Sequence, residues 1–352
     1  MITIIQQPAA INFSLSLLRV KLTSTDDQIN AKLSKGADLI VDEVYDLPPN
    51  GQALELNYED LVDLLLTAHQ PDYNSAVSVH EDTVADFTLQ LIDSDNTQTI
   101  AFRAIKGFVR RQPFDVEGFL RDNWLNLVPQ INTVHYHQPL YLTAYPETNV
   151  VAYAKAKMKT GLENTIALGT LEANKLQSVE LNPGKMIYRL GGEYEYFDVY
   201  TMQGSVIRNG YKRFYFTDRF EYNADTFFYL NRLGGWDSLV LTGERTSQNS
   251  NNISTALIDE YEHEYNQVQK LEFEKNSGWI SYEEHRRQCV DFLYSKQRYH
   301  LHEGALRRIV LNNSELNHTK GELTSFSFVF RHSDSKIAYP EIGIAPYHLE
   351  IK

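Results

Sequence analysis

The sequence predicts a mainly β protein built from several sandwich or barrel modules, with a few short helices. Aromatic residues give the first indication: the 352 residues include 22 Tyr and 17 Phe, which fit a pleated, half-buried strand. The second is period-two alternation of apolar and polar residues, and the third is the turn signals between the alternating segments. Short strands at this spacing are typical of sandwiches and barrels rather than of doubly wound sheets.

Alternation predicts strands throughout the chain. They cover residues 13–18, 87–92, 196–200, 213–216, 238–242 and 323–330. Turn signals rich in Asn, Asp, Gly and Pro separate them at residues 48–51, 93–96, 182–184, 208–210 and 312–314. The stretch 246–255 is polar apart from Ile253. We interpret it as a long exposed loop or a segment that a partner orders.

Helices are few, and we expect them over about 58–68, 115–123 and 282–295. The third has the clearest start, a capping box in which the Ser281 hydroxyl accepts from a backbone amide and Glu284 reaches back. Cys289, Phe292 and Leu293 then follow at i, i+3 and i+4, which places them on one apolar face of that helix.

The length allows two or three domains at roughly 100–200 residues each. We divide the chain into an N-terminal β-sandwich domain at 1–112, a middle β domain at 113–212 and a C-terminal β domain at 213–352. The segment Arg110–Pro113 closes the first domain, and the helix over about 282–295 belongs to the last.

Charge and composition exclude several classes of protein. Asp and Glu number 46 against 33 Lys and Arg, so the net charge is −13, which argues against a nucleic-acid binder. No apolar run approaches the ~18–20 residues of a membrane span, so we expect no membrane insertion. The first residues lack the pattern of a secretory signal, so we expect synthesis in the cytoplasm. The single cysteine, Cys289, excludes an intrachain disulfide.

No catalytic signature emerges from the motifs. His-Glu pairs begin at residues 80, 263 and 302, but none has the second His four residues later that a zinc helix requires. The pairs His135/His137 and His300/His302 each place two imidazoles on one strand face, and we interpret them as structural. Cys289 lies on an apolar helix stripe and is interpreted as a core residue. We therefore predict no catalytic residue, no cofactor and no metal, and a protein that is not an enzyme.

The most specific local feature is the segment Asn231–Ser238, which reads Asn-Arg-Leu-Gly-Gly-Trp-Asp-Ser. Two glycines allow a tight reversal between two strands, and the tryptophan anchors the hairpin. An aromatic residue beside such a turn is also able to present a binding surface. The candidate interaction surface consists of Leu233, Gly234, Gly235, Trp236 and Trp279.

At this segment the chain resembles virion proteins of tailed phages and prophages of Bacteroidetes. The resemblance is strongest over about 210–335. It rests on residues 227–237 and 239–243, on 278–284 and 291–295, on 308–313 and 323–331, and more weakly on Asn123-Trp-Leu and Gln138-Pro-Leu-Tyr-Leu142. It implies a structural protein of the tail tip or baseplate, similar to a distal-tail ring component, and brings no catalytic residues with it.

The resemblance implies a protein of the virion tail that assembles with itself, as a ring of three or six copies, and with other tail proteins. A carbohydrate-binding β-sandwich module that adheres to a host-surface glycan is the alternative. Its sugar-stacking residues would be Trp124, Trp236 and Trp279. A hydrolase is the lesser alternative.

Overall fold

The structure is a computed structural model that describes residues 1–49, 52–109, 114–217, 223–258, 261–280, 283–315 and 325–333. It is mostly β, with 51% of residues in strands and 14% in helices. The predicted fold class, mainly β with several sandwich-like modules and a few short helices, is confirmed. None of the helices in these ranges has both the length and the apolar character needed to cross a bilayer.

The chain forms two compact units. Unit 1 comprises Met1–Thr217 together with Leu230–Asp237, and unit 2 comprises Asp218–Tyr229 together with Ser238–Lys352. The short segment Leu230–Asp237 therefore returns to unit 1 from within the sequence of unit 2. The predicted division into three domains stays a prediction.

The first module of unit 1 packs a three-stranded sheet against a five-stranded one. The smaller sheet has the order β1–β3–β6, with β1 at Thr3–Gln6, β3 at Val20–Thr23 and β6 at Leu54–Leu56. The larger has the order β2–β9–β8–β4–β5, with β2 at Ile11–Phe13, β9 at Thr97–Ile105, β8 at Val84–Ile92, β4 at Gln28–Lys35 and β5 at Asp38–Asp46. Alternation in β8 places Phe87, Leu89 and Leu91 in their common core. Short helices flank it: η1 at Ser14–Ser16, α1 at Glu59–Leu64 and η3 at Glu81–Thr83.

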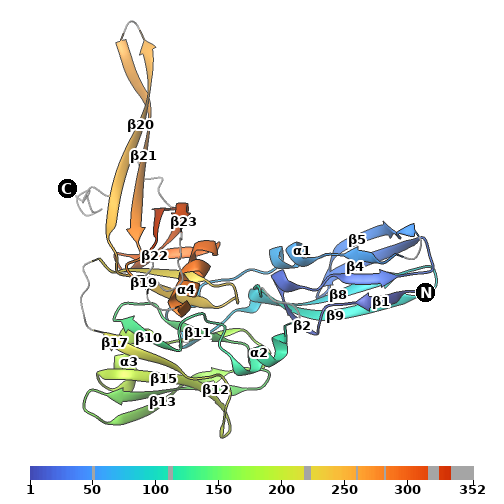
Figure 1. Cartoon of the computed structure of the whole chain (residues 1–352), viewed down its shortest axis with the longest axis horizontal. Coiled ribbons are helices and arrows are strands. Elements are labelled where there is room, and N and C mark those ends of the chain that lie inside the picture. The colour runs from blue at the N-terminus through green and yellow to red at the C-terminus, as the bar shows by residue number, and fades with distance from the viewer. Residues whose placement is uncertain are drawn as a thin grey trace, which may run out of the picture. The chain divides into compact units, whose positions relative to one another are not determined.

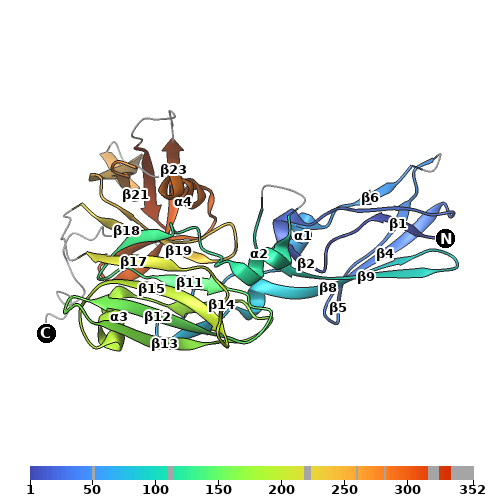
Figure 2. The ribbon, with the colours of Figure 1, turned by 60° about the horizontal axis from the view of Figure 1, so that its bottom comes forward.

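The second module of unit 1 also joins two sheets. The larger has the order β10–β17–β15–β12–β13, with β10 at Ile131–His135, β17 at Lys212–Thr217, β15 at Tyr194–Gln203, β12 at Val150–Met158 and β13 at Glu163–Leu171, and the two-residue β16 at Val206–Ile207 pairs with β15. Figure 2 shows β17, β15, β12 and β13 of this sheet side by side. The smaller has the order β11–β14–β7, with β11 at Tyr141–Ala144, β14 at Gln177–Glu180 and β7 at Val77–Val79. Leu142 and Val179 of the smaller sheet share one core with Phe197 of the larger. Helices α2 at Val116–Asp122 and α3 at Pro183–Leu190 complete unit 1.

One seven-stranded sheet makes up most of unit 2. Its order is β19–β18–β22–β23–β24–β21–β20, with β19 at Trp236–Leu241, β18 at Asp225–Leu230, β22 at Arg298–His302, β23 at Ala305–Glu315, β24 at Ser327–His332, β21 at Tyr261–Asn276 and β20 at Arg245–Ile258. Helix α4 at Glu283–Tyr294 packs Cys289 and Phe292 into the same core as Phe227 and Phe328.

Strands β20 and β21 form a long hairpin, here called the arm (residues 245–276), which continues beyond the rest of its sheet (Figure 1). Only its base, Phe273–Asn276, pairs with β24 among the strand pairings that the structure describes. The prediction of a loop over 246–255 is therefore wrong. A strand in a hairpin is held by the backbone hydrogen bonds of its partner, so it does not need an alternating apolar face.

Three further expectations need correction. The turn signal at 182–184 begins helix α3, because Pro183 occupies the first turn and Gly191, with φ of 78°, ends the helix. The turn signal at 312–314 lies inside β23, where the pairing register shifts between Leu311 and Asn313. The strand expected over 13–18 ends at Phe13.

Several predicted elements are found in place. Strands β8, β15, β17 and β19 cover the alternating segments at 87–92, 196–200, 213–216 and 238–242. The third helix is α4, at Glu283–Tyr294 against the expected 282–295. The capping residue Ser281, the segment 110–113, and parts of the expected turn at 48–51 and of the expected strand at 323–330 lie outside the described residues.

Candidate functional site

The segment Asn231–Asp237, the most specific motif of the sequence, forms a tight turn in unit 1. The Asn231 side chain organises it: its Oδ1 accepts hydrogen bonds from the backbone N–H of Leu233 at 2.8 Å and of Gly235 at 3.0 Å. Its Nδ2 donates to the carbonyl of Leu125 and to the carboxylate of Asp237, both at 2.8 Å. An Asn side chain that bonds the backbone ahead of it replaces a backbone turn.

The Asp237 carboxylate joins this turn to another part of unit 1. It accepts hydrogen bonds from Asn126 Nδ2 at 2.7 Å, from the Leu127 N–H at 2.9 Å and from Asn231 Nδ2. The Asn126 Oδ1 in turn accepts from the N–H of Thr143 at 2.6 Å. Burial raises the pKa of Asp237, against the effect of its hydrogen bonds. The carboxylate is 1% exposed, so it acts as a buried junction and not as a group that a ligand reaches.

The two glycines of the motif are needed because other backbone lies against them. A Cβ on Gly235 would lie 2.1 Å from the Leu125 carbonyl oxygen. A Cβ on Gly234 would lie 2.2 Å from the Lys106 carbonyl oxygen, and its φ of 82° is a value that L side chains rarely adopt. The motif therefore serves close packing within unit 1.

Replacing Gly235 by Ala is expected to lower the free energy of unfolding by about 2–3 kcal/mol, because backbone has to move away from the new methyl group. Gly210→Ala is the matched control, since nothing lies within 4 Å of a Cβ at that position. We expect the control to change stability by less than about 0.5 kcal/mol. Urea unfolding of the two variants measures the difference, and equal stabilities would contradict the close-packing interpretation.

The prediction that the five residues of the candidate interaction surface face outward is wrong for most of them. Trp236 is 1% exposed, Gly234 and Gly235 are buried and Leu233 is half-buried. Sequence reasoning treated the aromatic residue beside a glycine turn as able to face outward, whereas the buried hydrogen bonds of the turn hold it inside. Trp279 belongs to unit 2 and is 72% exposed, so an interaction role for that residue stays a prediction.

Two of the three tryptophans expected to stack on a sugar in the glycan alternative are also buried. Trp124 is 4% exposed, and its indole N–H donates to the Gly210 carbonyl at 3.0 Å. Since Trp236 is also buried, Trp279 is the one tryptophan with a ring face available to a sugar.

A Ser–His pair lies in unit 1 that sequence reasoning did not find. His80 Nε2 lies 2.8 Å from Ser178 Oγ, and Ser178 Oγ lies 2.8 Å from Thr143 Oγ1. Burial lowers the pKa of His80 to about 4, so the imidazole is neutral at pH 7. Ser178 and Thr143 are 0% exposed, and a hydroxyl that no substrate reaches is a structural hydrogen-bonding group.

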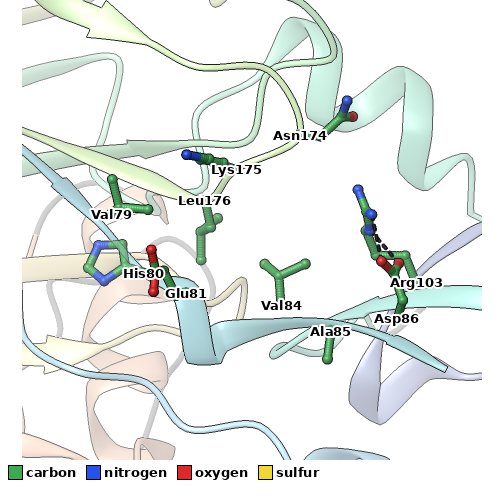
Figure 3. Close-up of a pocket in the computed structure, with 10 residues that line it drawn as sticks. All are labelled: Val79, His80, Glu81, Val84, Ala85, Asp86, Arg103, Asn174, Lys175 and Leu176. Carbon is green, nitrogen blue, oxygen red and sulfur yellow. Dashed lines mark hydrogen bonds and ion pairs between the residues drawn. The ribbon is translucent and has the colours of Figure 1, made fainter. Parts of the chain in front are cut away.

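Beside His80 lies a hollow of 210 Å³ (Figure 3). Its cationic side chains already have anionic partners. Arg103 donates to both carboxylate oxygens of Asp86, at 2.6 and 2.8 Å, and Lys175 pairs with Glu172. The hollow therefore does not offer an unpaired cation to an anionic ligand.

A second buried cluster lies in unit 2, at the base of the arm. The Asp225 carboxylate of β18 accepts from Arg245 Nη1 at 2.6 Å and contacts His300 Nε2 at 3.1 Å and Lys275 Nζ at 2.9 Å. Lys275 is 0% exposed and also donates to the carbonyls of Asn223 and Gly243. A fully buried ammonium is tolerated only with a counter-ion and hydrogen bonds, and Asp225 supplies the counter-ion.

This cluster predicts an acid-sensitive stability. Burial alone would raise the pKa of Asp225, but the hydrogen bonds from His300 and Lys275 and the charges of Lys275 and Arg245 outweigh it and lower the pKa from 3.8 to about 2. A carboxyl group with a depressed pKa in the folded state stabilises above its unfolded pKa, and that contribution is lost as the pH falls through the folded value. We expect a loss of about 2 kcal/mol between pH 4 and pH 2. In Asp225→Asn this part of the pH dependence should disappear from urea titrations.

Of the two histidine pairs that were each expected on one strand, the structure places only one on a single strand. His300 and His302 lie on β22 with ring centroids 5.5 Å apart, and His332 of β24 joins them, with its Nε2 3.2 Å from His300 Nδ1. The pair His135/His137 does not share a strand, because β10 ends at His135. Among the residues that the structure describes, no group of three His, Cys, Asp or Glu side chains is placed to hold a metal.

Cys289 is 0% exposed in the core, as predicted, and burial raises the pKa of its thiol to about 12.

Comparisons with known proteins identify no family. No family model matches the chain, and neither does any curated protein. Among solved structures, the calcium-binding domain CBD12 of CALX1.1 is 7% identical, with 57% of this chain and 92% of that chain covered and a TM-score of 0.18. A Salmonella alpha-2-macroglobulin mutant is 9% identical, with 91% of this chain and 29% of that chain covered and a TM-score of 0.19. Similarity at this level carries no argument about function.

Proposed function

We propose that the chain is a structural protein of a phage tail, a component of the tail tip or baseplate that is made in the host cytoplasm and acts in the virion. It assembles as a homo-oligomeric ring of three or six copies, contacts other tail proteins and is not an enzyme. The sequence resemblance over about 210–335 first suggests this function, and the arm of unit 2 is the structural observation that supports it most.

The arm is suited to a contact between subunits. Its strands run from Arg245 to Ile258 and from Tyr261 to Asn276, and β20 at roughly 3.3 Å per residue is about 46 Å long. A two-stranded hairpin without further packing is marginally stable in water, and its outer edges offer unpaired backbone N–H and C=O groups. A neighbouring molecule would satisfy these groups and stabilise the hairpin.

The buried polar clusters are consistent with a structural role. Asp237 and Asp225 have their hydrogen bonds inside the protein, and the Ser178 hydroxyl is out of reach of solvent. The most specific sequence motif thus contributes to the fold of unit 1. Assembly proteins need rigid modules that present repeated contact surfaces, and such networks provide the rigidity.

A shortened arm tests the proposal. Gln248 pairs with Glu272 in the hairpin, so residues 249–271 are replaced by Asn-Gly, a dipeptide that closes a two-residue hairpin. Light scattering across a concentration series and negative-stain imaging are expected to show rings for the natural chain and smaller species for the shortened one. The melting temperature of the shortened chain should stay within a few degrees, because the buried core residues of unit 2 are kept and, of the described residues that pack half-buried against that core, only Leu271 is lost.

Two outcomes would count against the proposal. A natural chain that stays monomeric at every concentration and with purified tail proteins would remove its basis. Rings of unchanged size in the shortened chain would show that the arm is not the contact, and the support would then fall back on the sequence resemblance.

A further inference from the structure

The two edges of the arm differ in charge. Strand β20 carries no charged residue and no proline from Thr246 to Ile258. Outside the part that pairs with β24, strand β21 carries charged residues at Glu262, Glu264, Lys270 and Glu272. Proteins protect exposed strand edges with charges, prolines or bulges. By that measure the β21 edge is protected, and the β20 edge is open along most of its length.

Among the other edge strands of the described residues, β5 shows the contrast most clearly, whereas β13, at Glu163–Leu171, carries only Glu163. Strand β5 ends the five-stranded sheet of unit 1 and carries Asp38, Asp42, Glu43 and Asp46. Two copies of β5 would bring like charges together, which opposes pairing. The whole chain has a net charge of −13, so copies repel one another over much of their surface. The β20 edge is a place where two copies can approach without that repulsion.

We propose that β20 pairs in antiparallel fashion with β20 of a second copy, along residues 246–254, about a two-fold axis. This contact rests on the proposed function and narrows it: a two-fold contact closes at two copies, so it fits six copies arranged as three such pairs, or two rings joined to each other, and not a single ring of three. Residues 246–249 are exposed, and the register of the hairpin shifts between Ser254 and Thr255, where the uninterrupted edge ends. A strand is always complementary to itself in antiparallel pairing, since each copy offers the same alternating donors and acceptors.

The composition of the strand fits this partner. Asn, Gln, Ser and Thr make up residues 246–252, and in a strand pair such side chains hydrogen-bond to one another across the ladder. Pairing also satisfies the backbone groups of both β20 edges. The association therefore closes at two copies instead of growing into a fibre.

Charge on the edge provides the first test. In the double variant Asn251→Lys, Asn252→Lys, two positive charges are added at adjacent positions of β20, so pairing of two copies brings four of them together. The dimer dissociation constant, measured by sedimentation, is expected to rise about tenfold or more. The matched control is Asn266→Lys, Gln267→Lys on β21, which adds the same charge to the other edge of the arm and should leave the dissociation constant unchanged.

Disulfide trapping provides a second test that does not depend on the stability of a charged variant. Single cysteines are placed in turn at residues 248 to 252, and Cys289 does not interfere because it is 0% exposed. Under mild oxidation we expect covalent dimers, with the highest yield at the residue nearest the two-fold axis. Lys270→Cys is the control. Lys270 lies on β21, opposite Ser250 in the hairpin, so β20 separates it from the proposed contact and we expect no covalent dimer.

The outcomes separate this contact from the proposed function. A natural chain without a dimer, an unchanged dissociation constant in the lysine variant of β20, or no cysteine dimer at 248 to 252 would each overturn the β20 contact. Rings that persist in the lysine variant would leave the tail proposal standing without this contact. Cross-linked dimers that never form rings would support the contact and count against the ring.

Discussion

Asp225→Asn is expected to lower the free energy of unfolding by about 3–5 kcal/mol, the usual cost of removing one partner from a buried ion pair. The reason is Lys275, which is 0% exposed and lies with its Nζ 2.9 Å from the Asp225 carboxylate. Asparagine keeps the shape of the side chain but removes the negative charge, so the buried ammonium loses its counter-ion. Urea unfolding followed by near-ultraviolet circular dichroism measures the loss.

Two comparisons make this prediction specific. In Asp86→Asn the same change is made to the partner of Arg103, but the Asp86 side chain is 65% exposed, so we expect a loss below about 1 kcal/mol. In the double variant Asp225→Asn, Lys275→Met both charges are absent, and we expect it to be more stable than Asp225→Asn alone. A double variant that is less stable than the single one would show that the ammonium does not cause the loss.

Trp236→Ala is expected to cost about 3–5 kcal/mol of stability, as is usual when a buried aromatic side chain is deleted. The residue is 1% exposed and follows Gly235, whose backbone lies against the Leu125 carbonyl. The same change at Trp279, which is 72% exposed, is the matched control and should alter stability by less than about 0.5 kcal/mol.

The same pair of variants bears on the glycan alternative. A glycan array probed with both proteins should show no change in binding for Trp279→Ala if the chain is purely an assembly protein. Loss of a glycan signal in Trp279→Ala, with unchanged stability, would instead favour adhesion through that ring. If Trp236→Ala proved as stable as the natural chain, the assignment of Trp236 to a tightly packed turn would be wrong.

The local features of the fold could be predicted from the sequence. Alternation located strands such as β8 and β15, and the apolar spacing of Cys289 and Phe292 located helix α4. These features depend on neighbours in the sequence, because one face of a strand or helix has to be buried whichever element covers it. Helix α3 could also have been predicted from the sequence, since Pro183 and Gly191 occupy the positions typical of helix ends.

The strand β20 and the site residues could not be predicted in this way. A polar segment such as 246–255 becomes a strand through hydrogen bonds to β21. The residues of the segment itself show no alternation that would indicate this pairing. The Ser178–His80 pair is 98 residues apart in the sequence. The partners of Asp225 come from three other strands, so no motif with fixed spacing contains them.

By itself the sequence determined that this protein is mainly β, acidic and built of several modules with few helices. The tertiary structure alone decided which strands pair, that Trp236 is inside, and that the charged residues Asp225 and Lys275 share one buried cluster. The physical reason is the range of the interactions. Turn chemistry, capping and alternation act over a few residues, whereas burial and the pairing of a charge depend on whatever distant segment the folded chain brings alongside.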